Sequence, residues 1–415
     1  MDTFIVSYAG EAAVSGVSLV NSFNTIFIYL FTALASGGAV VISQYIGSQD
    51  KKNSILSSSQ LLMFSCVFSC VLSVMVLLFQ RPILSGLFGR VETDVMDACM
   101  TYLRISAYSY PFIAVYNAGA SLYRSMAKTK TTMNISLVSN LINIIGNYIG
   151  VFVLHAGVAG VAVPSLLARA FSAIVITILC FNRQLVTHYA KEDVFTWNGA
   201  MLKRVLNIAV PNGIENGIFQ FVKVALSSVV ALFGTYQIAA NGIAQSIWSL
   251  AALMGVALGP VYITVIGQCM GKQDTAQAKY YFKKLNRLAL VLSLIWNAFV
   301  FLITPGWMKF YQVSDETIQM VIYLVAIHNF FNAFVYPFSG PLSNGLRAAG
   351  DVKFTMIVSI ASTVLGRFVF SLLFAIYFNL GVIGIALAMC LDWSLRAVIF
   401  YLRYKSDTWM KFKVI

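Results

Sequence analysis

The residues best suited to chemistry lie in VPNGIENGIFQFVKV, residues 210–224, where polar side chains interrupt an apolar stretch. Four of them, spaced by three or four residues, would share one face of a helix: Asn212, Glu215, Asn216 and Gln220. Pro211 removes one backbone hydrogen bond and predicts a kink beside them. This stripe should line water, where Glu215 could bind and release H+ or Na+ because burial disfavours a charged carboxylate. The alternative is a permanent pair of Glu215 with Lys223 or another base.

Other polar residues within apolar stretches are candidates because their burial is costly. The acids are Asp2 and Asp392, and Asp392 lies four residues before Arg396, which predicts an ion pair within one helix. The remaining bases are Arg104, Arg169 and Arg367. A second stripe at helical spacing fits hydrogen bonding between helices as well as substrate binding: Asn140, Asn143 and Asn147.

The composition places these residues in a membrane protein. Hydrophobic residues make up 59% of the 415 and charged residues 10%, against roughly 25% charged in soluble domains. A spanning helix needs about 20 mostly apolar residues. Eleven helices are predicted, preceded by a partial helix over residues 1–9. Their ranges are 15–46, 56–79, 97–119, 133–154, 158–181, 205–232, 239–270, 285–303, 317–341, 354–378 and 381–402.

The net charge of +13 does not indicate nucleic-acid binding, because the basic residues alternate between loops as in a membrane protein. Of the 28 Lys and Arg residues, 20 fall in the loops of one face and in the C-terminal tail, whereas Arg81, Arg90 and Lys309 fall on the other. The positive-inside rule assigns the crowded face and the C-terminus to the cytoplasm.

Catalytic and metal-binding motifs are missing from the sequence. The six cysteines lie mostly in apolar segments, which does not suggest a disulfide framework, and Cys66 and Cys70 have no accompanying metal ligands. The three histidines form no metal-ligand motif, and neither a Gly-x-Ser-x-Gly elbow nor a phosphate-binding Gly-Lys-Ser/Thr loop occurs. We therefore expect no enzyme, no metal, no cofactor and no use of ATP.

Three segments recur in the same order. ISQYIGSQDKKNS (42–54) matches IGQCMGKQDTAQA (266–278) 224 positions later, GVAGVAV (157–163) matches GVIGIAL (381–387), and RSMAKTKTTM (124–133) matches RAAGDVKFTM (347–356). This pattern predicts duplication of a six-helix unit, with parallel halves and a substrate site between them, as in some secondary transporters. We expect an N-terminal lobe over 1–181, a cytoplasmic linker over 182–204 and a C-terminal lobe over 205–415.

The first repeated segment ends two apolar helices with the same residues. The glycine is expected to end each helix and the amide to satisfy its last carbonyls. These turns have one of two roles: they only end helices, or they also act as pivots when the two halves move. The residues concerned are Gln44 and Gly47 in the first turn, and Gln268 and Gly271 in the second.

The sequence resembles the MATE (multidrug and toxic compound extrusion) transporters. The likeness rests on five motifs in order: MDTFIVSYAG, ISQYIGSQD, PNGIENGIFQFVK, IGQCMGKQD and LRAAGDVKF. It implies an all-α, twelve-helix fold of two six-helix lobes around a cavity, and export of amphipathic, often cationic compounds in exchange for H+ or Na+. Asp2 matches the family's first-helix acid, a cation-binding candidate. The family's sodium-linked branch also has an acid in the tenth helix, and its absence between Thr317 and Asp351 weakens the case for Na+.

The first helix is expected to be truncated. The second lobe's first helix begins near Val205, and the repeat interval puts its counterpart about 20 residues before Met1. A chain that began at Met1 would also place its charged amino group inside the hydrocarbon, which is costly and supports the same expectation.

The second transporter hypothesis is a lipid-linked oligosaccharide flippase of the same superfamily. It would use cations inside the cavity for phosphate: Arg104, Arg169, Lys223 and Arg367. Under either hypothesis we expect a monomer in the bacterial inner membrane, with a small amphipathic substrate and no nucleic-acid partner.

Overall fold

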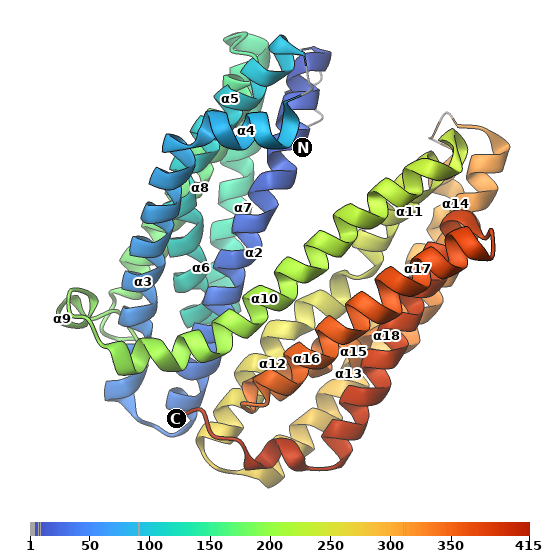
Figure 1. Cartoon of the computed structure of the whole chain (residues 1–415). Helices are drawn as coiled ribbons and strands as arrows, with labels where there is room; N and C mark the ends of the chain where they lie inside the picture. Colours follow the sequence, from blue (N-terminus) through green and yellow to red (C-terminus); the bar gives the residue numbers. More distant parts are fainter. Residues whose placement is uncertain (1–4, 7, 9, 90–91, 310, 312) are drawn as a thin grey trace. The chain divides into compact units, whose positions relative to one another are not determined.

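The computed structural model describes the chain except for residues 1–4, 7, 9, 90–91, 310 and 312. The described residues form helices joined by turns, with no β-strand among them. The chain divides into two compact units, residues 1–213 and 214–415 (Figure 1).

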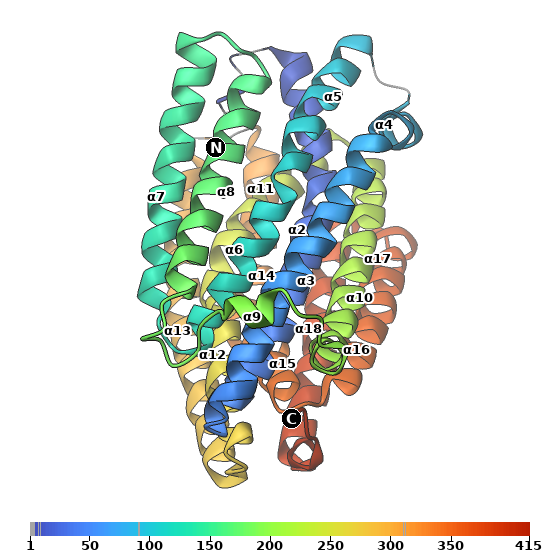
Figure 2. The ribbon, with the colours of Figure 1, turned by 90° about the vertical axis from the view of Figure 1, so that its left-hand side faces the viewer.

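Unit 1 is a helical bundle in which α6 packs on α2, α3 and α8, and α2 packs on α3 (Figure 2). Its helices are α2 (Glu11–Gly47), α3 (Lys51–Leu78), α4 (Gln80–Phe88), α5 (Thr93–Tyr108), α6 (Tyr110–Ser125), α7 (Thr129–Tyr148), α8 (Ala159–Cys180), α9 (Lys191–Val194) and the first part of α10 (Gly199–Val230). A π-helical turn, Ile149–Val153, continues α7.

Unit 2 is a second bundle, in which α12 packs on α15 and α15 on α18. After the end of α10 and a 3₁₀ turn, its helices are α11 (Thr235–Ala251), α12 (Leu253–Gly271), α13 (Thr275–Met308), α14 (Asp315–Phe334), α15 (Tyr336–Ala348), α16 (Val352–Ala361), α17 (Phe370–Leu372) and α18 (Gly381–Lys405). Two π-helical turns, Ser362–Val369 and Leu373–Tyr377, flank α17.

Ten helical segments of the described chain are long and apolar enough to span a membrane. The eleventh predicted span, 97–119, is divided at Ser109 into α5 and α6, which are 16 residues each. The predicted spans 239–270 and 317–341 are also divided, at Ala252 and Val335. The breaks at Ser109 and Val335 are each followed by a proline in the first turn of the next helix. Proline is tolerated there because the N–H groups of a helix's first turn have no carbonyl partner within the helix.

The predicted linker, 182–204, overlaps the start of α10. Its last residues, 199–204, are already helical, because α10 begins at Gly199 rather than near Val205. Residues 182–198 pack against α3 (Figure 2). The Gln60 side chain of α3 donates a hydrogen bond to the carbonyl of Asp193 at 2.7 Å and accepts one from the Asn198 N–H at 2.9 Å. The segment 182–198 is therefore part of unit 1.

The backbone confirms the duplication. Residues with positive φ recur in pairs at intervals of 223 or 224, with Asp407 as the exception among described residues: Gly10 and Gly234, Gln49 and Gln273, Ala127 and Gly350, His155 and Asn379, Gly157 and Gly381. The π-turn at residues 149–153 recurs at 373–377. Helix pairing is also repeated, since α2 packs on α6 as α12 packs on α15.

The repeated Gln-Asp turns join helices end to end. Gly47 and Gly271 are the last helical residues, but the left-handed residues are Gln49 and Gln273. The last carbonyls accept backbone N–H groups in a Schellman arrangement, Asp50 N–H to Tyr45 and its counterpart Asp274 N–H to Cys269. Gly47 and Gly271 therefore end their helices as predicted, and backbone N–H groups satisfy the last carbonyls. The backbone carbonyls of Gln44 and Gln268 accept hydrogen bonds from the N–H groups of Ser48 and Lys272.

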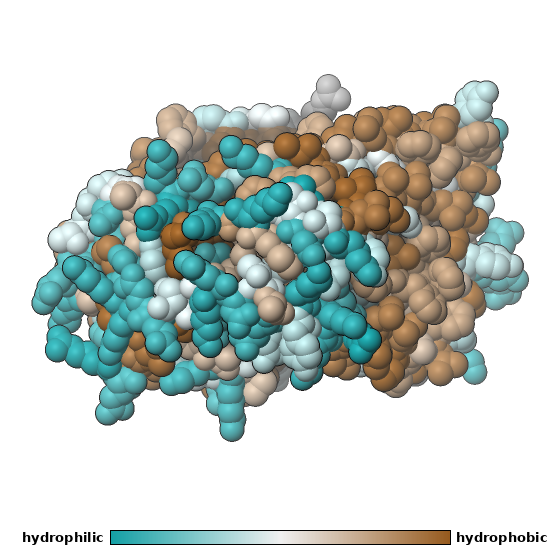
Figure 3. Space-filling model, turned by 90° about the horizontal axis from the view of Figure 1, so that it is seen from below, coloured by the Kyte–Doolittle hydropathy of each residue, from teal (hydrophilic) through white to brown (hydrophobic). Residues whose placement is uncertain are grey.

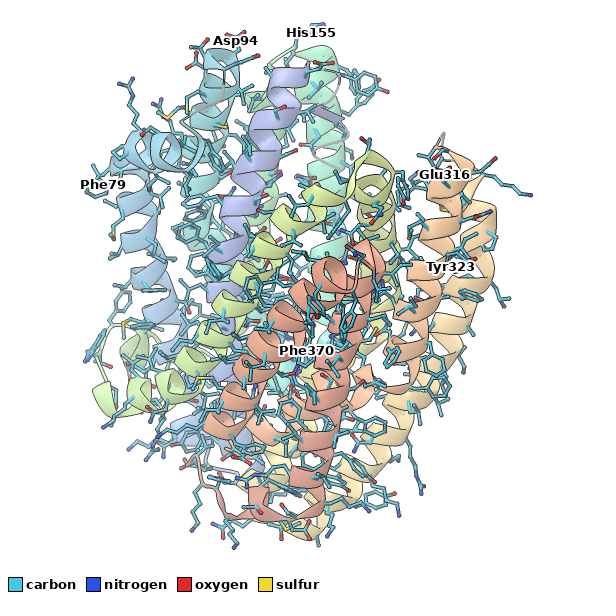
Figure 4. The ribbon with its side chains drawn as sticks, turned by 45° about the vertical axis from the view of Figure 1, so that its right-hand side comes forward. Phe79, Asp94, His155, Glu316, Tyr323 and Phe370 are labelled. Carbon is cyan, nitrogen blue, oxygen red and sulfur yellow. The ribbon has the colours of Figure 1, made fainter. Side chains whose placement is uncertain are left out.

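Charge and hydrophobicity are distributed as a bilayer requires. Hydrophobic residues such as Leu78, Phe221 and Leu302 are more than 70% exposed, as expected of a lipid-facing surface. Figure 3 shows hydrophilic residues gathered on one part of the surface and hydrophobic residues on another. Figure 4 shows Glu316 at one end of unit 2 and Tyr323 along its length.

The aspartates of the repeated turns generate the first prediction. Asp50 Oδ1 accepts from the Asn53 N–H at 3.1 Å, and Asp274 Oδ1 accepts from the Gln277 N–H at 2.8 Å, so each caps the following helix. Asp274→Ala should lower the free energy of unfolding by about 1 kcal/mol, whereas Asp274→Asn should keep most of it. Thermal melting in detergent micelles checks this, and equal melting temperatures for both variants would contradict the capping role.

Candidate functional site

The polar stripe predicted on residues 212–220 lies on α10, which continues through Pro211. Asn212 is buried, whereas Glu215, Asn216 and Gln220 are half-buried. Stripe residues are therefore removed from bulk solvent on a helix that is otherwise apolar.

Within unit 2, Glu215 forms a two-oxygen ion pair with Arg347 in the last turn of α15. Arg347 Nη2 lies 2.7 Å from Oε1 and 2.6 Å from Oε2 of the carboxylate. The side chains are 10% and 14% exposed, so water screens the pair little. Arg347 Nε also donates to Thr355 Oγ1 at 3.4 Å, which fixes the guanidinium. The partner of Glu215 is thus Arg347 rather than Lys223, whose side chain is exposed.

Unit 2 contains a second buried charge cluster. Asp392 is completely buried and pairs with Arg396 one turn away, which confirms the predicted ion pair. Arg367 Nε lies 3.2 Å from Asp392 Oδ2, and the Ser362 hydroxyl donates to Oδ1 at 2.7 Å. Two guanidinium groups therefore share one carboxylate, which leaves one surplus positive charge inside the bundle.

The surroundings of Arg367 compensate this surplus only in part. Its guanidinium lies 4.7 Å from the centre of the Phe219 ring on α10, close enough for a cation–π interaction. The Nη2 of Arg367 and both ring nitrogens of buried His328 have no hydrogen-bond partner among the described residues. A buried polar group without a partner costs free energy, so this cluster can accept an anionic or hydrogen-bonding group.

Unit 1 contains a polar core on the other set of helices. Tyr102 donates to Asn21 Oδ1 at 3.1 Å, and Tyr110 donates to Asn24 Oδ1 at 2.7 Å. Arg169 donates to the Ser109 hydroxyl at 2.7 Å, at the break between α5 and α6.

The second predicted stripe divides between packing and a cavity. Asn143 donates to Ser165 Oγ at 2.8 Å, which links α7 to α8, and Asn147 donates to Asn143 Oδ1 at 3.2 Å. Asn140 lines a cavity of about 210 Å³ together with Arg169. Hydrogen bonding between helices thus accounts for Asn143, the bond from Asn147 stays within α7, and Asn140 remains available to a ligand.

Other predicted residues do not join these groups. Asp2 lies outside the described residues. Arg104 and Lys223 are exposed on their own helices, so neither belongs to the buried clusters. Among the described residues, no group of three or more His, Cys, Asp or Glu side chains could hold a metal ion.

Sequence reasoning missed Arg347 as a site residue, because its place in a basic loop repeat resembles a topology determinant. One sequence signal was present. Arg347 precedes Gly350, the left-handed residue that ends the helix, so its side chain belongs to a helical turn rather than to a loop.

The family follows from a sequence model. The MatE family model matches residues 1–149 and 211–373, which is more than half of the chain. The chain belongs to the MATE family. It is therefore a multi-pass membrane transporter, and the all-helical architecture agrees with that assignment.

Curated relatives extend over the whole chain. The "Uncharacterized transporter YisQ" of Bacillus subtilis (strain 168) is 24% identical over 418 residues, which cover 99% of this chain and 90% of the relative. The "Probable multidrug resistance protein NorM" of Thermotoga maritima is 22% identical over 424 residues, covering 100% of this chain and 89% of the relative.

Solved structures share the fold. The "Outward-facing conformation of a multidrug resistance MATE family transporter of the MOP superfamily" superposes with a TM-score of 0.88 at 20% identity, over 98% of this chain and 90% of that one. The structure entitled "Reverse polarity of binding pocket suggests different function of a MOP superfamily transporter from Pyrococcus furiosus Vc1" has a TM-score of 0.89 at 20% identity, over 99% and 92%. At such identities the likeness concerns the fold.

The Glu215–Arg347 pair generates a stability prediction. Arg347→Met would leave a buried carboxylate without its partner and should lower the free energy of unfolding by about 3–5 kcal/mol. The double variant Glu215→Gln, Arg347→Met removes both charges and should recover most of this loss. Denaturation in detergent measures the parent, the single variants Arg347→Met and Glu215→Gln, and the double variant, with Lys223→Met as the control for an exposed cation. Simple addition of the two single effects would contradict the pair.

The surplus charge around Asp392 predicts an asymmetry. Arg367→Met leaves the balanced pair of Asp392 and Arg396 and should change stability little. Asp392→Asn leaves two buried guanidinium groups without a counter-ion and should destabilise unit 2 severely. Melting temperatures of the two variants decide the question, and a loss as large for Arg367→Met as for Asp392→Asn would show that the three residues act as one balanced unit.

Proposed function

We propose that this chain exports amphipathic, often cationic, small molecules in exchange for H+ or Na+ by alternating access. Family membership supports transport, and the relatives named as multidrug resistance proteins support the class of substrate. The observation that carries the coupling role is the half-buried carboxylate of Glu215, whose oxygens are both engaged by one guanidinium group.

The geometry makes Arg347 a competitor of the coupling ion. Na+ is a hard cation that binds oxygen ligands such as carboxylate oxygens, and a proton binds to the same oxygens. Both oxygens of Glu215 lie within 2.7 Å of Arg347 Nη2, so an ion can bind fully only when the guanidinium moves away. Ion uptake at Glu215 would then separate α10 from α15 within unit 2, and ion release would restore the pair. Such a two-state contact can link ion binding to a change of access.

The other functional residues have supporting roles in this proposal. Asn212, Asn216 and Gln220 supply hydrogen-bonding groups along α10, and Asn140 supplies one in unit 1. Asp2 is proposed as a second cation-binding acid on the family resemblance. The turns with Gln44, Gly47, Gln268 and Gly271 are proposed as pivots.

The cellular setting is part of the same proposal. The protein works as a monomer in the bacterial inner membrane, with the C-terminus in the cytoplasm, and it uses neither ATP nor a bound cofactor. The strongly uneven distribution of Lys and Arg between the loops supports this orientation.

A second candidate function is transport of a lipid-linked oligosaccharide. The observation that favours it is the buried pair of guanidinium groups around the single carboxylate of Asp392. A surplus cation suits a phosphate-containing substrate better than a cationic drug. Arg104 and Lys223, which this hypothesis would also use, lie outside the buried clusters.

Uptake of the fluorescent cation ethidium into everted membrane vesicles tests the main proposal. A pH gradient and a Na+ gradient are imposed separately. The parent should accumulate ethidium under one of them, and Glu215→Gln should abolish this uptake because the amide holds no exchangeable cation. Lys223→Gln, which removes an exposed charge from the same helix, should transport like the parent.

Two outcomes would overturn the proposal. Gradient-driven uptake by Glu215→Gln at the parent's rate would remove Glu215 from the coupling step. An absence of uptake under both gradients, with the protein present in the membrane, would favour the flippase.

A further inference from the structure

A groove of about 960 Å³ lies on unit 2, and no residue of either charge cluster lines it. Its walls are α13 and α18, which flank α15. At one end it is lined by basic residues and tyrosines, and at the other by Leu290, Phe334 and Val398. The groove is therefore amphipathic along its length.

The basic end coincides with the place where α13 would leave the hydrocarbon. The helix has 34 residues and is about 51 Å long, whereas the hydrocarbon core is about 30 Å thick. Its uncharged run covers residues 288–303, so the preceding turns lie at the level of the lipid headgroups. Lys279, Lys283 and Arg287 follow one another at intervals of four on this protruding part and line the groove.

The charge of the groove is not compensated by its own walls. Lys279 pairs with Asp407, but Lys283 and Arg287 have no ion-pair partner among the described residues. Lys405 enters from α18, with its ammonium group 5.6 Å from the centre of the Tyr401 ring. No carboxylate lines the groove in the part of the chain that the structure describes.

In unit 1, the chain itself covers the corresponding surface. Lys283, Asn286 and Tyr404 of the groove correspond, 224 positions earlier, to Ser59, Leu62 and Cys180. Leu62 and Cys180 form one hydrophobic cluster with Leu185 and Tyr189 of the segment 182–198. Ser59 Oγ accepts from the Ala190 N–H at 3.0 Å, so neutral side chains bind the covering backbone.

In unit 2, the residues after α18 follow a different course. Trp409 is fully buried and packs against Phe282, at 4.8 Å between ring centres, but none of residues 406–415 lines the groove. The positions whose neutral side chains bind or face the covering segment in unit 1 carry positive charges in unit 2. Ser59 and Gln60 correspond to Lys283 and Lys284, and Met63 corresponds to Arg287.

We propose that this groove binds an anionic phospholipid of the cytoplasmic leaflet. The phosphate would lie between Lys283, Arg287 and Lys405, and an acyl chain would lie along Phe334 and Val398. A phospholipid matches the separation of charge and apolar surface along the groove, and the cytoplasmic leaflet is rich in anionic headgroups. The inference takes the cytoplasmic orientation of this end from the proposed function.

Native mass spectrometry of the purified full chain in detergent tests the proposal. The probes are dioleoyl phosphatidylglycerol and, as the neutral lipid, dioleoyl phosphatidylcholine. The parent should retain the first and not the second. The variant Lys283→Ser, Arg287→Met installs the residues of unit 1 and should bind phosphatidylglycerol about thirtyfold more weakly, since each cation near a lipid phosphate contributes about fivefold.

A matched variant controls for loss of charge. Lys272→Ser, Lys284→Ser also removes two cations near the same end, but neither residue lines the groove, and it should bind like the parent. Equal weakening in both double variants would reduce the effect to general charge and overturn the site. Retention of phosphatidylglycerol by Lys283→Ser, Arg287→Met, or no binding to the parent, would also overturn it.

Glycerol 3-phosphate separates lipid binding from binding of a free anion. It should not displace phosphatidylglycerol at comparable concentration, because it lacks the acyl chains, and full displacement would assign the site to a soluble phosphate. Glu215→Gln should bind phosphatidylglycerol like the parent. Lipid binding with failed ethidium transport would therefore refute the proposed function alone, and the reverse would refute only the lipid site.

Discussion

The structure depends on one constraint: within hydrocarbon, each backbone polar group and each charge must be satisfied by the protein itself. The helices satisfy their own backbones, and the turns between them satisfy the last carbonyls through left-handed residues such as Gln49 and Gln273. The buried charges follow the same rule in pairs, Glu215 with Arg347 and Asp392 with its two arginines. An ion or a substrate can therefore bind where a buried charge is only partly compensated by the protein.

Because the two units arose by duplication, they satisfy their backbone polar groups with the same turns. The residues that differ between the units indicate different functions. Five pairs of positive-φ residues, and the two π-turns, lie at equivalent positions in both units. The buried charge clusters, by contrast, belong to unit 2, whereas unit 1 has a core of hydrogen-bonded asparagines and tyrosines. The surface beside α13 differs as well, because its counterpart on α3 is covered by the segment 182–198.

Much of the fold could be predicted because hydrophobic length and repeated motifs are properties of the sequence alone. The breaks at Ser109, Ala252 and Val335 could not, since only the prolines at 111 and 337 hinted at them and the helical period continues across each break. Glu215 could be selected because a carboxylate in an apolar helix is costly wherever it lies. Its partner could not, because Arg347 is 132 residues away in sequence and only the packing of α10 and α15 brings the two together.

The central claim is that the coupling ion and Arg347 compete for the oxygens of Glu215. Infrared difference spectroscopy of the purified protein, with Glu215→Gln to identify the carboxylate band, measures the concentration of H+ or Na+ at which that band changes. Competition between the ion and Arg347 predicts that Arg347→Met shifts this midpoint to lower ion concentration, because the competitor is gone. An unchanged midpoint in Arg347→Met would show that Arg347 and the ion do not compete for Glu215.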